Sequence, residues 1–229
     1  MNKHLEYLRN SYQKQYTNPV GAVSISGLKV YIKEPLPPQV DLRGSFSYVL
    51  QNMPRHLFRN VTEIHIGKFP FLKRRQVDAI FKDGIIYLSN DQQDNSDIIT
   101  DLVHELAHAC EELYGNDLYQ DGKIKNEFLH KRERLYLILS SNGVIDQNTK
   151  KDKFLQVNYD ADFDAFLYQT VGYQKLASLT RGLFISPYAA TSLREYFANA
   201  FENFFVNDIN LVKKYCPNVY DKLLQYLEF

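Results

Sequence analysis

The sequence of 229 residues contains no tryptophan, two cysteines and no excess of charge of either sign. It has no run of apolar residues approaching the ~18 that a transmembrane helix needs. A formal net charge of zero creates no long-range field that would attract nucleic acid or an anionic membrane surface. We therefore expect neither nucleic acid nor a membrane as a partner.

The scarcity of cysteine argues against a disulfide or zinc-knuckle framework. Cys110 and Cys216 lie far apart in the chain, and neither belongs to a CxxC pair. Two buried free thiols are the expected arrangement, and they favour a reducing compartment. The first residues, MNKHLEYLRNSYQKQY, contain no apolar segment of the kind found in signal peptides. We expect a protein that is cytoplasmic or released without a signal peptide.

Several common catalytic and binding motifs are also missing. The chain has no glycine-rich phosphate loop and no nucleophile elbow, which argues against a P-loop nucleotide-binding protein and a serine hydrolase. Residues 160–164, DADFD, open like a calcium loop, but Ala165 and Val171 occupy the positions where an EF-hand requires glycine and glutamate. A solvated acidic turn or helix start is the better interpretation of this segment.

The composition that is present is typical of one soluble globular domain. Hydrophobic residues make up 45% and charged residues 24% of the chain, and 17 tyrosines and 15 phenylalanines predict a thick aromatic core. A chain of this length can bury a substantial core. We expect a single domain over residues 1–229 and a monomer.

The predicted elements place strands before helices. The N-terminal part shows, in chain order, a helix over 3–16, a β-branched stretch over 23–32 interrupted by Gly27, a proline-rich connector over 33–39, a strand over 61–66 and a solvated basic loop over 68–75. Two apolar runs within 77–90, joined at Asp83-Gly84, then predict a β-hairpin.

Helical patterns fill the rest of the chain. They are expected over 95–115, 125–143, 160–180, 192–207 and from Pro217 onward. Asn95 or Ser96 is the expected N-cap of the first helix, Gly115 its end, and Ser192 the N-cap of the fourth. This order predicts an α+β fold, in which a mainly β part (1–94) with a small mixed sheet and an edge-strand hairpin precedes a mainly helical part (95–229).

The first of these helices carries the most informative motif, TDLVHELAHACEELYG (100–115). His104 and His108 are four residues apart, so they lie on one helical face about 6 Å apart along the axis. Two imidazole nitrogens placed in this way can converge on one tetrahedral Zn²⁺ ion, which we expect once per chain. Glu105 points beside the metal, where it can take a proton from zinc-bound water as a general base.

The surroundings of the motif favour a true metal site over a chance match. Leu106 and Ala107 fill its two variable positions, and Val103 and Ala109 flank it. Two imidazoles and a carboxylate on so apolar a helix carry a desolvation cost that a bound cation would offset. The spacing and the surroundings together predict a zinc site.

The third ligand defines the subclass of the site. An extended HExxHxxGxxH motif needs glycine at position 111 and histidine at 114, where this chain has Glu111 and Tyr114. Glu112 lies two turns, about 12 Å, from His104, which is too far for one ion to bind both without breaking the helix. His130, in the charged segment FLHKRER, is expected to be exposed.

Glu195, in SLREYFANAFENFF (192–205), is the remaining candidate. Its helix is otherwise rich in apolar residues such as Phe197 and Phe201, and a carboxylate buried among them needs a cation. The alternative is a partly exposed glutamate that the helix dipole favours at a helix start. Asn199, one turn later on the same face, can orient a zinc-bound imidazole.

Three segments of the chain resemble the anthrax lethal factor-like metallopeptidases, a group that includes the clostridial Pro-Pro endopeptidases. HELAHACEELYG (104–115) is similar to the zinc helix of that family, and YAATSLREYFANAFENFF (188–205) resembles its tyrosine followed by a glutamate-bearing helix. KKYCPNVYDKLLQYL (213–227) looks like its closing helix. The stretch between the first two, about 116–187, is longer than in those relatives and is expected to add a helical lobe.

The resemblance implies a gluzincin, with residues 1–229 forming a single zincin-like catalytic domain. In that class His104, His108 and Glu195 would bind one zinc ion, and Glu105 would act as the general base. The resemblance also implies that Tyr188, seven residues before Glu195, stabilises the oxyanion of the reaction. That role rests on the resemblance alone, because the chain contains 17 tyrosines.

In gluzincins the strand before the zinc helix is a sheet edge that pairs with the peptide substrate. By this analogy GIIYLSN (84–90) would bind substrate through its backbone, at Ile86 and Leu88. The resemblance thus implies both the chemistry of the site and a surface for the substrate.

The sequence therefore predicts a zinc-dependent endopeptidase that acts on a peptide or protein substrate. The main alternative is a zinc-stabilised binding or structural protein, virus-encoded for instance, that keeps the metallopeptidase architecture with little turnover. Nothing in the motif is degenerate, which argues against this alternative. A metallopeptidase that works on DNA is a third hypothesis, and the neutral charge argues against it.

Overall fold

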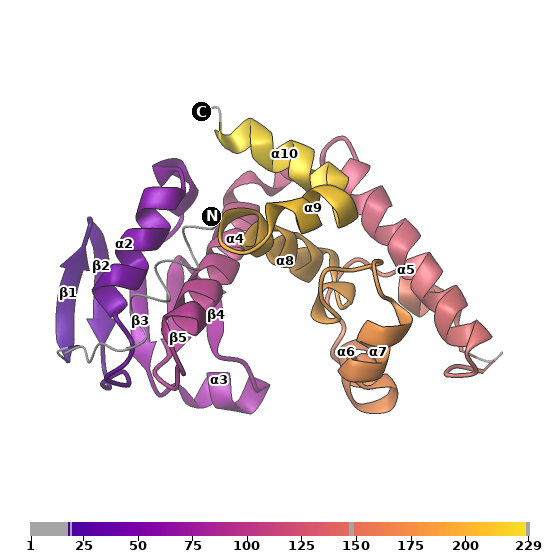
Figure 1. The fold of residues 1–229 in the computed structure, drawn as a ribbon, viewed down its shortest axis with the longest axis horizontal. Coiled ribbons are helices and arrows are strands. Elements are labelled where there is room, and N and C mark those ends of the chain that lie inside the picture. Colours follow the sequence, from indigo (N-terminus) through magenta and orange to yellow (C-terminus); the bar gives the residue numbers. More distant parts are fainter. Residues whose placement is uncertain (1–17, 19, 147–148, 228–229) are drawn as a thin grey trace. The chain divides into compact units, whose positions relative to one another are not determined.

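The computed structural model describes residues 18, 20–146 and 149–227, so the helix expected over 3–16 lies outside the described residues. The chain divides into two compact units: Met1–Leu113 with Phe205–Asn207, and Tyr114–Phe204 with Asp208–Phe229. Figure 1 shows their helices and strands, labelled in chain order. None of the helices in the described ranges has the length and apolar character needed to cross a membrane.

The first unit is built on a five-stranded sheet with the strand order β1-β2-β3-β5-β4. Its strands are β1 (Gly21–Ile25), β2 (Leu28–Ile32), β3 (Glu63–Gly67), β4 (Ala79–Lys82) and β5 (Ile85–Ser89). β2, β3 and β5 run parallel to one another, whereas β1 and β4 are antiparallel to their neighbours. The predicted mixed sheet is confirmed, and the fold is α+β.

Two tight turns shape this sheet. The predicted hairpin joins β4 and β5 at Asp83 and Gly84, whose φ angles of 52° and 78° are the left-handed values that a two-residue hairpin turn requires. The stretch predicted over 23–32 is also a hairpin, because Ser26 and Gly27 take φ angles of 52° and 94° and separate β1 from β2. Glycine adopts such values at little cost.

Alternating side chains explain why these segments form a buried sheet. Val30, Ile64, Ile66, Ile86 and Leu88 are each 0% exposed. Burial of an aliphatic side chain contributes about 1.5 to 3 kcal/mol, so these positions hold the centre of the sheet in place. The proline-rich residues 33–39 form neither helix nor strand, as expected of a connector.

The first unit also contains helices that the sequence did not reveal. The helix α2 (Leu42–Asn52) begins after Asp41, whose carboxylate accepts a hydrogen bond of 2.9 Å from the Gly44 amide. The basic segment 68–75 was expected to be a loop, but it forms the helix α3 (Pro70–Arg75). Proline stands at its first turn, where no amide partner is needed.

The helix α4 (Asn95–Tyr119) continues beyond the residue expected to end it. Gly115 lies inside the helix, where glycine costs about 1 kcal/mol relative to alanine. Contacts after Gly115 offset that cost: Leu118 is 1% exposed, and the Tyr226 hydroxyl donates a hydrogen bond of 2.6 Å to Asp117. The Tyr119 ring also packs against Phe197, with centroids 6.4 Å apart. Tertiary packing therefore outweighs the local preference of glycine to end a helix.

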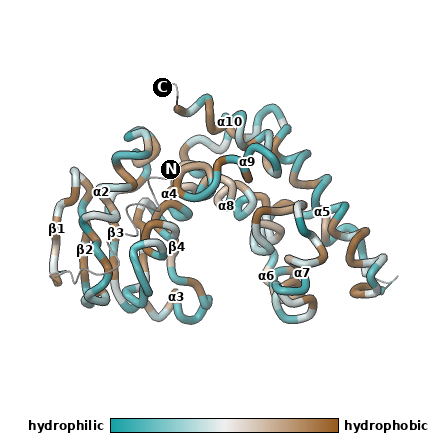
Figure 2. The backbone as a smooth tube through the Cα atoms, in the orientation of Figure 1, coloured by the Kyte–Doolittle hydropathy of each residue, from teal (hydrophilic) through white to brown (hydrophobic). Residues whose placement is uncertain are grey.

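The second unit is helical. Its elements are α5 (Lys123–Ser141), η2 (Lys151–Leu155), α6 (Ala161–Ala165), η3 (Phe166–Val171), α7 (Tyr173–Leu179), η4 (Tyr188–Ala190), α8 (Leu193–Phe205), α9 (Ile209–Tyr215) and α10 (Pro217–Leu227). The helices expected at 125–143, at 192–207 and after Pro217 are confirmed. The segment 160–180 is helical in pieces, because Gly172 with a φ of 82° separates η3 from α7. Hydrophobic and hydrophilic stretches alternate along α5 in Figure 2.

Both cysteines are buried and free, as predicted. Burial raises the pKa of Cys110 to about 12, and its thiol donates a hydrogen bond of 3.2 Å to the Leu57 carbonyl. Burial likewise raises the pKa of Cys216 to about 12. Neither thiol therefore has the character of a nucleophile or a metal ligand.

Candidate metal centre

The HELAH motif lies in the buried part of α4. The helix is capped by Asp94, whose carboxylate accepts hydrogen bonds from the amides of Ser96 (2.7 Å) and Asp97 (3.2 Å). The expected cap, Asn95 or Ser96, was therefore placed one or two residues too late. Asn95 instead accepts a hydrogen bond from the Asp41 amide and so ties the helix start to the start of α2.

The apolar face of α4 carries the motif into the protein interior. The residues around the two histidines are 0 to 1% exposed: Ile98, Ile99, Leu102, Val103, Leu106, Ala107 and Ala109. His108 is 5% exposed and His104 is half-buried. Their ring centroids lie 5.0 Å apart with an interplanar angle of 85°. The spacing predicted from the sequence, two imidazoles on one helical face, is what the structure shows.

Glu105 is held by the strand β4. The residue is 6% exposed, and its Oε2 atom accepts a hydrogen bond of 2.5 Å from the backbone N–H of Phe81. A hydrogen bond to a carboxylate is roughly twice as strong as one between neutral groups. One oxygen of Glu105 is thus fixed, and the orientation of the other oxygen follows from it.

Glu195 stands in the first turn of α8. The Ser192 hydroxyl oxygen accepts a hydrogen bond of 3.1 Å from the Glu195 amide, which confirms Ser192 as the N-cap. Glu195 is half-buried, although its neighbours Tyr196 and Phe197 are 0% exposed. The cap fixes the direction in which the helix begins and therefore the position of the carboxylate.

His104, His108 and Glu195 form a group of potential metal ligands in the described part of the chain. Each offers one ligand atom, and these atoms all lie within 4.8 Å of one another. In a tetrahedral zinc site with bonds of about 2.0 to 2.1 Å, neighbouring ligand atoms are about 3.3 Å apart. Two imidazoles and one carboxylate also form a donor set that suits zinc.

Asn199 has an unsatisfied polar atom. The residue is 9% exposed, and its Oδ1 atom is buried without a hydrogen-bond partner among the described residues. An unpaired buried acceptor typically costs about 1 to 3 kcal/mol. An imidazole N–H, fixed in orientation when the opposite ring nitrogen binds a metal, is the kind of donor that such an atom lacks. The unpaired acceptor therefore fits the orienting role predicted for Asn199.

Two acidic residues near the histidines were not singled out from the sequence. Asp101, one turn before His104, accepts a hydrogen bond of 3.0 Å from Gln92. Burial raises the pKa of Asp101 to about 7, against the opposing effect of that hydrogen bond, and the Coulombic influence of His104 also lowers it. Glu111 places a carboxylate oxygen 3.8 Å from Nδ1 of His108. Their spacing in the sequence could have indicated them, because Asp101 lies three residues before His104 and Glu111 lies three residues after His108.

The expected substrate-binding residues are placed differently from the prediction. β5, which contains Ile86 and Leu88, is paired with β3 on one side and with β4 on the other. Both residues are 0% exposed. A strand with two partner strands has no free backbone groups for a third. The prediction that β5 is an edge strand that pairs with the substrate is therefore wrong. The outermost strand on this side of the sheet is β4.

Tyr188, the expected oxyanion donor, begins the short helical turn η4. Its side chain is half-buried. The Thr191 hydroxyl donates a hydrogen bond of 2.8 Å to the Tyr188 carbonyl and closes the turn. Tyr188 and Glu195 thus belong to one continuous stretch that leads from η4 into α8.

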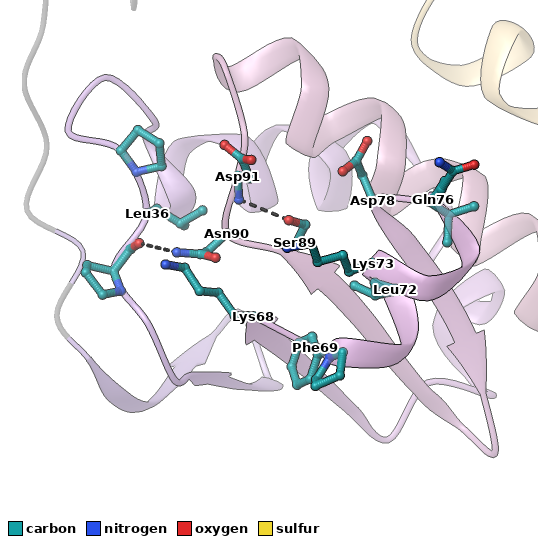
Figure 3. A pocket seen from close by; sticks show the side chains of 14 residues that line it. Leu36, Lys68, Phe69, Leu72, Lys73, Gln76, Asp78, Ser89, Asn90 and Asp91 are labelled. Atoms are coloured by element: carbon teal, nitrogen blue, oxygen red, sulfur yellow. Dashed lines mark hydrogen bonds between the residues drawn. The ribbon is translucent and has the colours of Figure 1, made fainter.

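A cavity in the first unit is distinct from the metal ligands. It has a volume of about 870 Å³ and lies at the carboxyl ends of β3 and β5, as Figure 3 shows. Its walls include Phe69 and Leu72, and Lys68 and Asp78 are among its charged residues. No residue of the HELAH motif lines it. The residues that line the cavity are therefore separate from the candidate metal ligands.

One comparison with known proteins identifies a related family. Residues 148–228 match the family model of the glucose-regulated metallo-peptidase M90. The matched segment contains Tyr188, Glu195 and Asn199 and begins after α4, so it is independent of the HELAH motif. No curated protein and no solved structure gives a significant match.

The match supports a metallopeptidase, and hence a bound metal ion and a peptide or protein substrate. It does not address the closer resemblance to the anthrax lethal factor-like group, which stays a prediction. The identity of the metal, the monomeric state and the absence of nucleic-acid and membrane partners stay predictions as well.

Proposed function

We propose that the protein is a zinc-dependent endopeptidase of the gluzincin class, similar to the anthrax lethal factor-like enzymes. The observation that carries the proposal is the grouping of His104, His108 and Glu195 within 4.8 Å. Two independent signals support it, because the histidines come from a sequence motif and Glu195 lies in the segment matched by a metallopeptidase family.

In this proposal His104, His108 and Glu195 bind the ion, and Glu105 transfers the proton. A bound zinc ion supplies Lewis acidity, which lowers the pKa of a water molecule and polarises a peptide carbonyl. Glu105 accepts the proton of the attacking water at Oε1, since Oε2 already accepts the Phe81 N–H. It then passes that proton to the amine that leaves as the C–N bond breaks.

Tyr188 and Asn199 have supporting roles in the proposed reaction. The phenol O–H of Tyr188 donates a hydrogen bond to the oxygen on which negative charge develops. The Oδ1 atom of Asn199 accepts the N–H of a ligating imidazole and fixes the orientation of that ring. The unpaired state of this atom in the structure supports the second role.

The outer edge of β4 is the proposed surface for the peptide backbone. In the antiparallel pair with β5, the Ser89 amide donates to the Asp78 carbonyl, so the alternate residues Ile80 and Lys82 also face β5. Ala79 and Phe81 therefore direct their backbone groups away from β5. The Phe81 N–H is taken by Glu105, which leaves Ala79 and the Phe81 carbonyl to pair with an extended peptide.

We expect N-methylation of a peptide substrate to weaken its binding at every second backbone amide, because alternate amides of a paired strand face β4. Peptide amides that face β4 lose a hydrogen bond when methylated, and KM should rise about tenfold for each such bond of ~1.4 kcal/mol. Amides that face away should give KM values within about twofold of the parent peptide. Steady-state kinetics on a series of singly methylated peptides measures this. Equal tolerance at all positions would contradict pairing with β4.

A peptide-library assay with matched metal analysis tests the proposed function as a whole. The purified protein is expected to contain about one zinc ion per chain, to cleave internal peptide bonds, and to lose and regain this activity when a chelator and then zinc are added. The alternative of a zinc-stabilised binding protein predicts the same metal content with no cleavage. Protein without metal and without activity would contradict both.

A further inference from the structure

Arg132 is a buried charge that the proposed reaction does not use. The residue is 1% exposed and is the largest fully buried side chain of the described residues. It lies in the apolar stripe of α5, between Phe128 and Leu135. Burial lowers the pKa of Arg132 to about 9, although Asp160 acts in the opposite direction. Arginine is rarely buried so completely unless hydrogen bonds or charged partners compensate for its lost hydration.

The partners of the guanidinium are backbone carbonyls and aromatic rings. One terminal nitrogen donates to the carbonyls of Ala190 (2.6 Å) and Thr191 (3.1 Å), and the other donates to Lys153 (2.9 Å). The guanidinium carbon lies 3.9 Å from the centroid of the Phe163 ring, which is a close cation–π contact. Arg132 thus ties α5 to the backbone at the end of η4 and to that of η2.

The backbone that Arg132 holds connects Tyr188 to Glu195. Ala190 and Thr191 are 0% and 1% exposed. The same stretch is fixed elsewhere by the Leu193 amide, which donates a hydrogen bond of 2.9 Å to the Val157 carbonyl. The stretch is therefore anchored on both sides of the α8 N-cap, and the anchor nearer to Tyr188 is Arg132.

We propose that Arg132 is a positioning residue that sets the backbone of residues 188–195 and thereby the placement of the Tyr188 phenol and the Glu195 carboxylate. The proposal rests on the proposed function for the roles of those two side chains. Arginine suits the task because its planar fork reaches three carbonyls in two directions, whereas lysine offers one nitrogen. Misplacement of a catalytic group by about 1 Å can lower a rate about 100-fold.

The test compares Arg132→Lys and Arg132→Met with Leu139→Ala. Leu139 is 0% exposed and lies on the same stripe of α5, so its truncation weakens the helix packing without removing a bond to residues 188–195. Hydrogen exchange is measured on the metal-free proteins by mass spectrometry. The amides of Ala190, Thr191 and Leu193 are hydrogen-bonded and report on the segment directly.

We expect Arg132→Met to raise the exchange rates of these three amides at least about tenfold more than the rates of amides elsewhere in the protein. Arg132→Lys should raise them by a smaller factor. Leu139→Ala should speed exchange without preference for the segment. In the zinc-loaded enzyme Arg132→Met should lower kcat about 100-fold with KM within about threefold, and Leu139→Ala should leave both near the parent values below its unfolding temperature.

Two results would overturn the proposal. The first is exchange at residues 190–193 that changes no more in Arg132→Met than in Leu139→Ala. The second is faster local exchange with an unchanged kcat, which would reduce Arg132 to a structural role. A parent protein without peptidase activity would refute the proposed function instead, and the exchange comparison would still decide whether Arg132 anchors the segment.

Discussion

Replacement of Glu105 by glutamine is expected to lower kcat/KM for peptide hydrolysis by about 10²- to 10⁴-fold, the usual contribution of a general base. Glutamine keeps the shape of the side chain, and its carbonyl oxygen can still accept the Phe81 N–H that Glu105 accepts in the structure. It cannot accept a proton from water. Because Glu105 is not among the three proposed metal ligands, the zinc content should stay at about one ion per chain.

Glu112 offers a matched control for this prediction. It is an exposed glutamate on the same helix, and Glu112→Gln should leave kcat/KM within about twofold of the parent value, the range of ordinary surface substitutions. Steady-state kinetics on one peptide, together with metal analysis of all three proteins, makes the comparison. Glu105→Gln with substantial residual turnover, or with its zinc lost, would contradict the role of Glu105 as a base outside the metal shell.

Replacement of Glu195 by alanine is expected to weaken zinc binding by more than about 100-fold, which exceeds the usual effect of losing an outer hydrogen-bond partner. Two imidazoles on one helix remain, and a pair of ligands holds zinc poorly. Peptidase activity should fall with the metal. Competition with a chromophoric chelator gives the dissociation constants, and thermal unfolding of the metal-free proteins checks that the variant folds.

Glu202 provides the control on the same helix, α8. Glu202→Gln removes a carboxylate charge two turns away from Glu195 and should leave zinc affinity within about threefold of the parent value, because its effect is a screened long-range one. Equal zinc affinity in the parent protein and in Glu195→Ala would exclude Glu195 as a ligand. The gluzincin assignment would then fail, whatever the activity of the protein.

Local chemistry made part of the fold predictable. The hairpin at Asp83-Gly84 follows from a two-residue turn whose φ angles of 52° and 78° favour these residue types. The order of the strands could not be predicted in the same way. It depends on parallel pairing of β2 with β3 and of β3 with β5, which joins residues far apart in the sequence. No local pattern indicates which strand is outermost, so β5 was wrongly taken as the edge.

The candidate metal ligands were predictable for a different reason. The spacing of His104 and His108 is a local helical property, and Glu195 stood out as a carboxylate in an apolar helix. Arg132 and Asp101 did not stand out, because a charged residue within an amphipathic pattern has the same appearance whether it faces solvent or the core. Only the packing shows that Arg132 is 1% exposed and that burial raises the pKa of Asp101 to about 7.

Anomalous diffraction at the zinc absorption edge, from crystals of the zinc-loaded protein, tests the central claim most directly. The account predicts one anomalous peak per chain, with one nitrogen of His104 and one of His108 at about 2.0 to 2.1 Å and a carboxylate oxygen of Glu195 at about 2.0 to 2.2 Å. A peak bound by the two histidines with Glu195 beyond coordinating distance, or a peak on other residues, would contradict it.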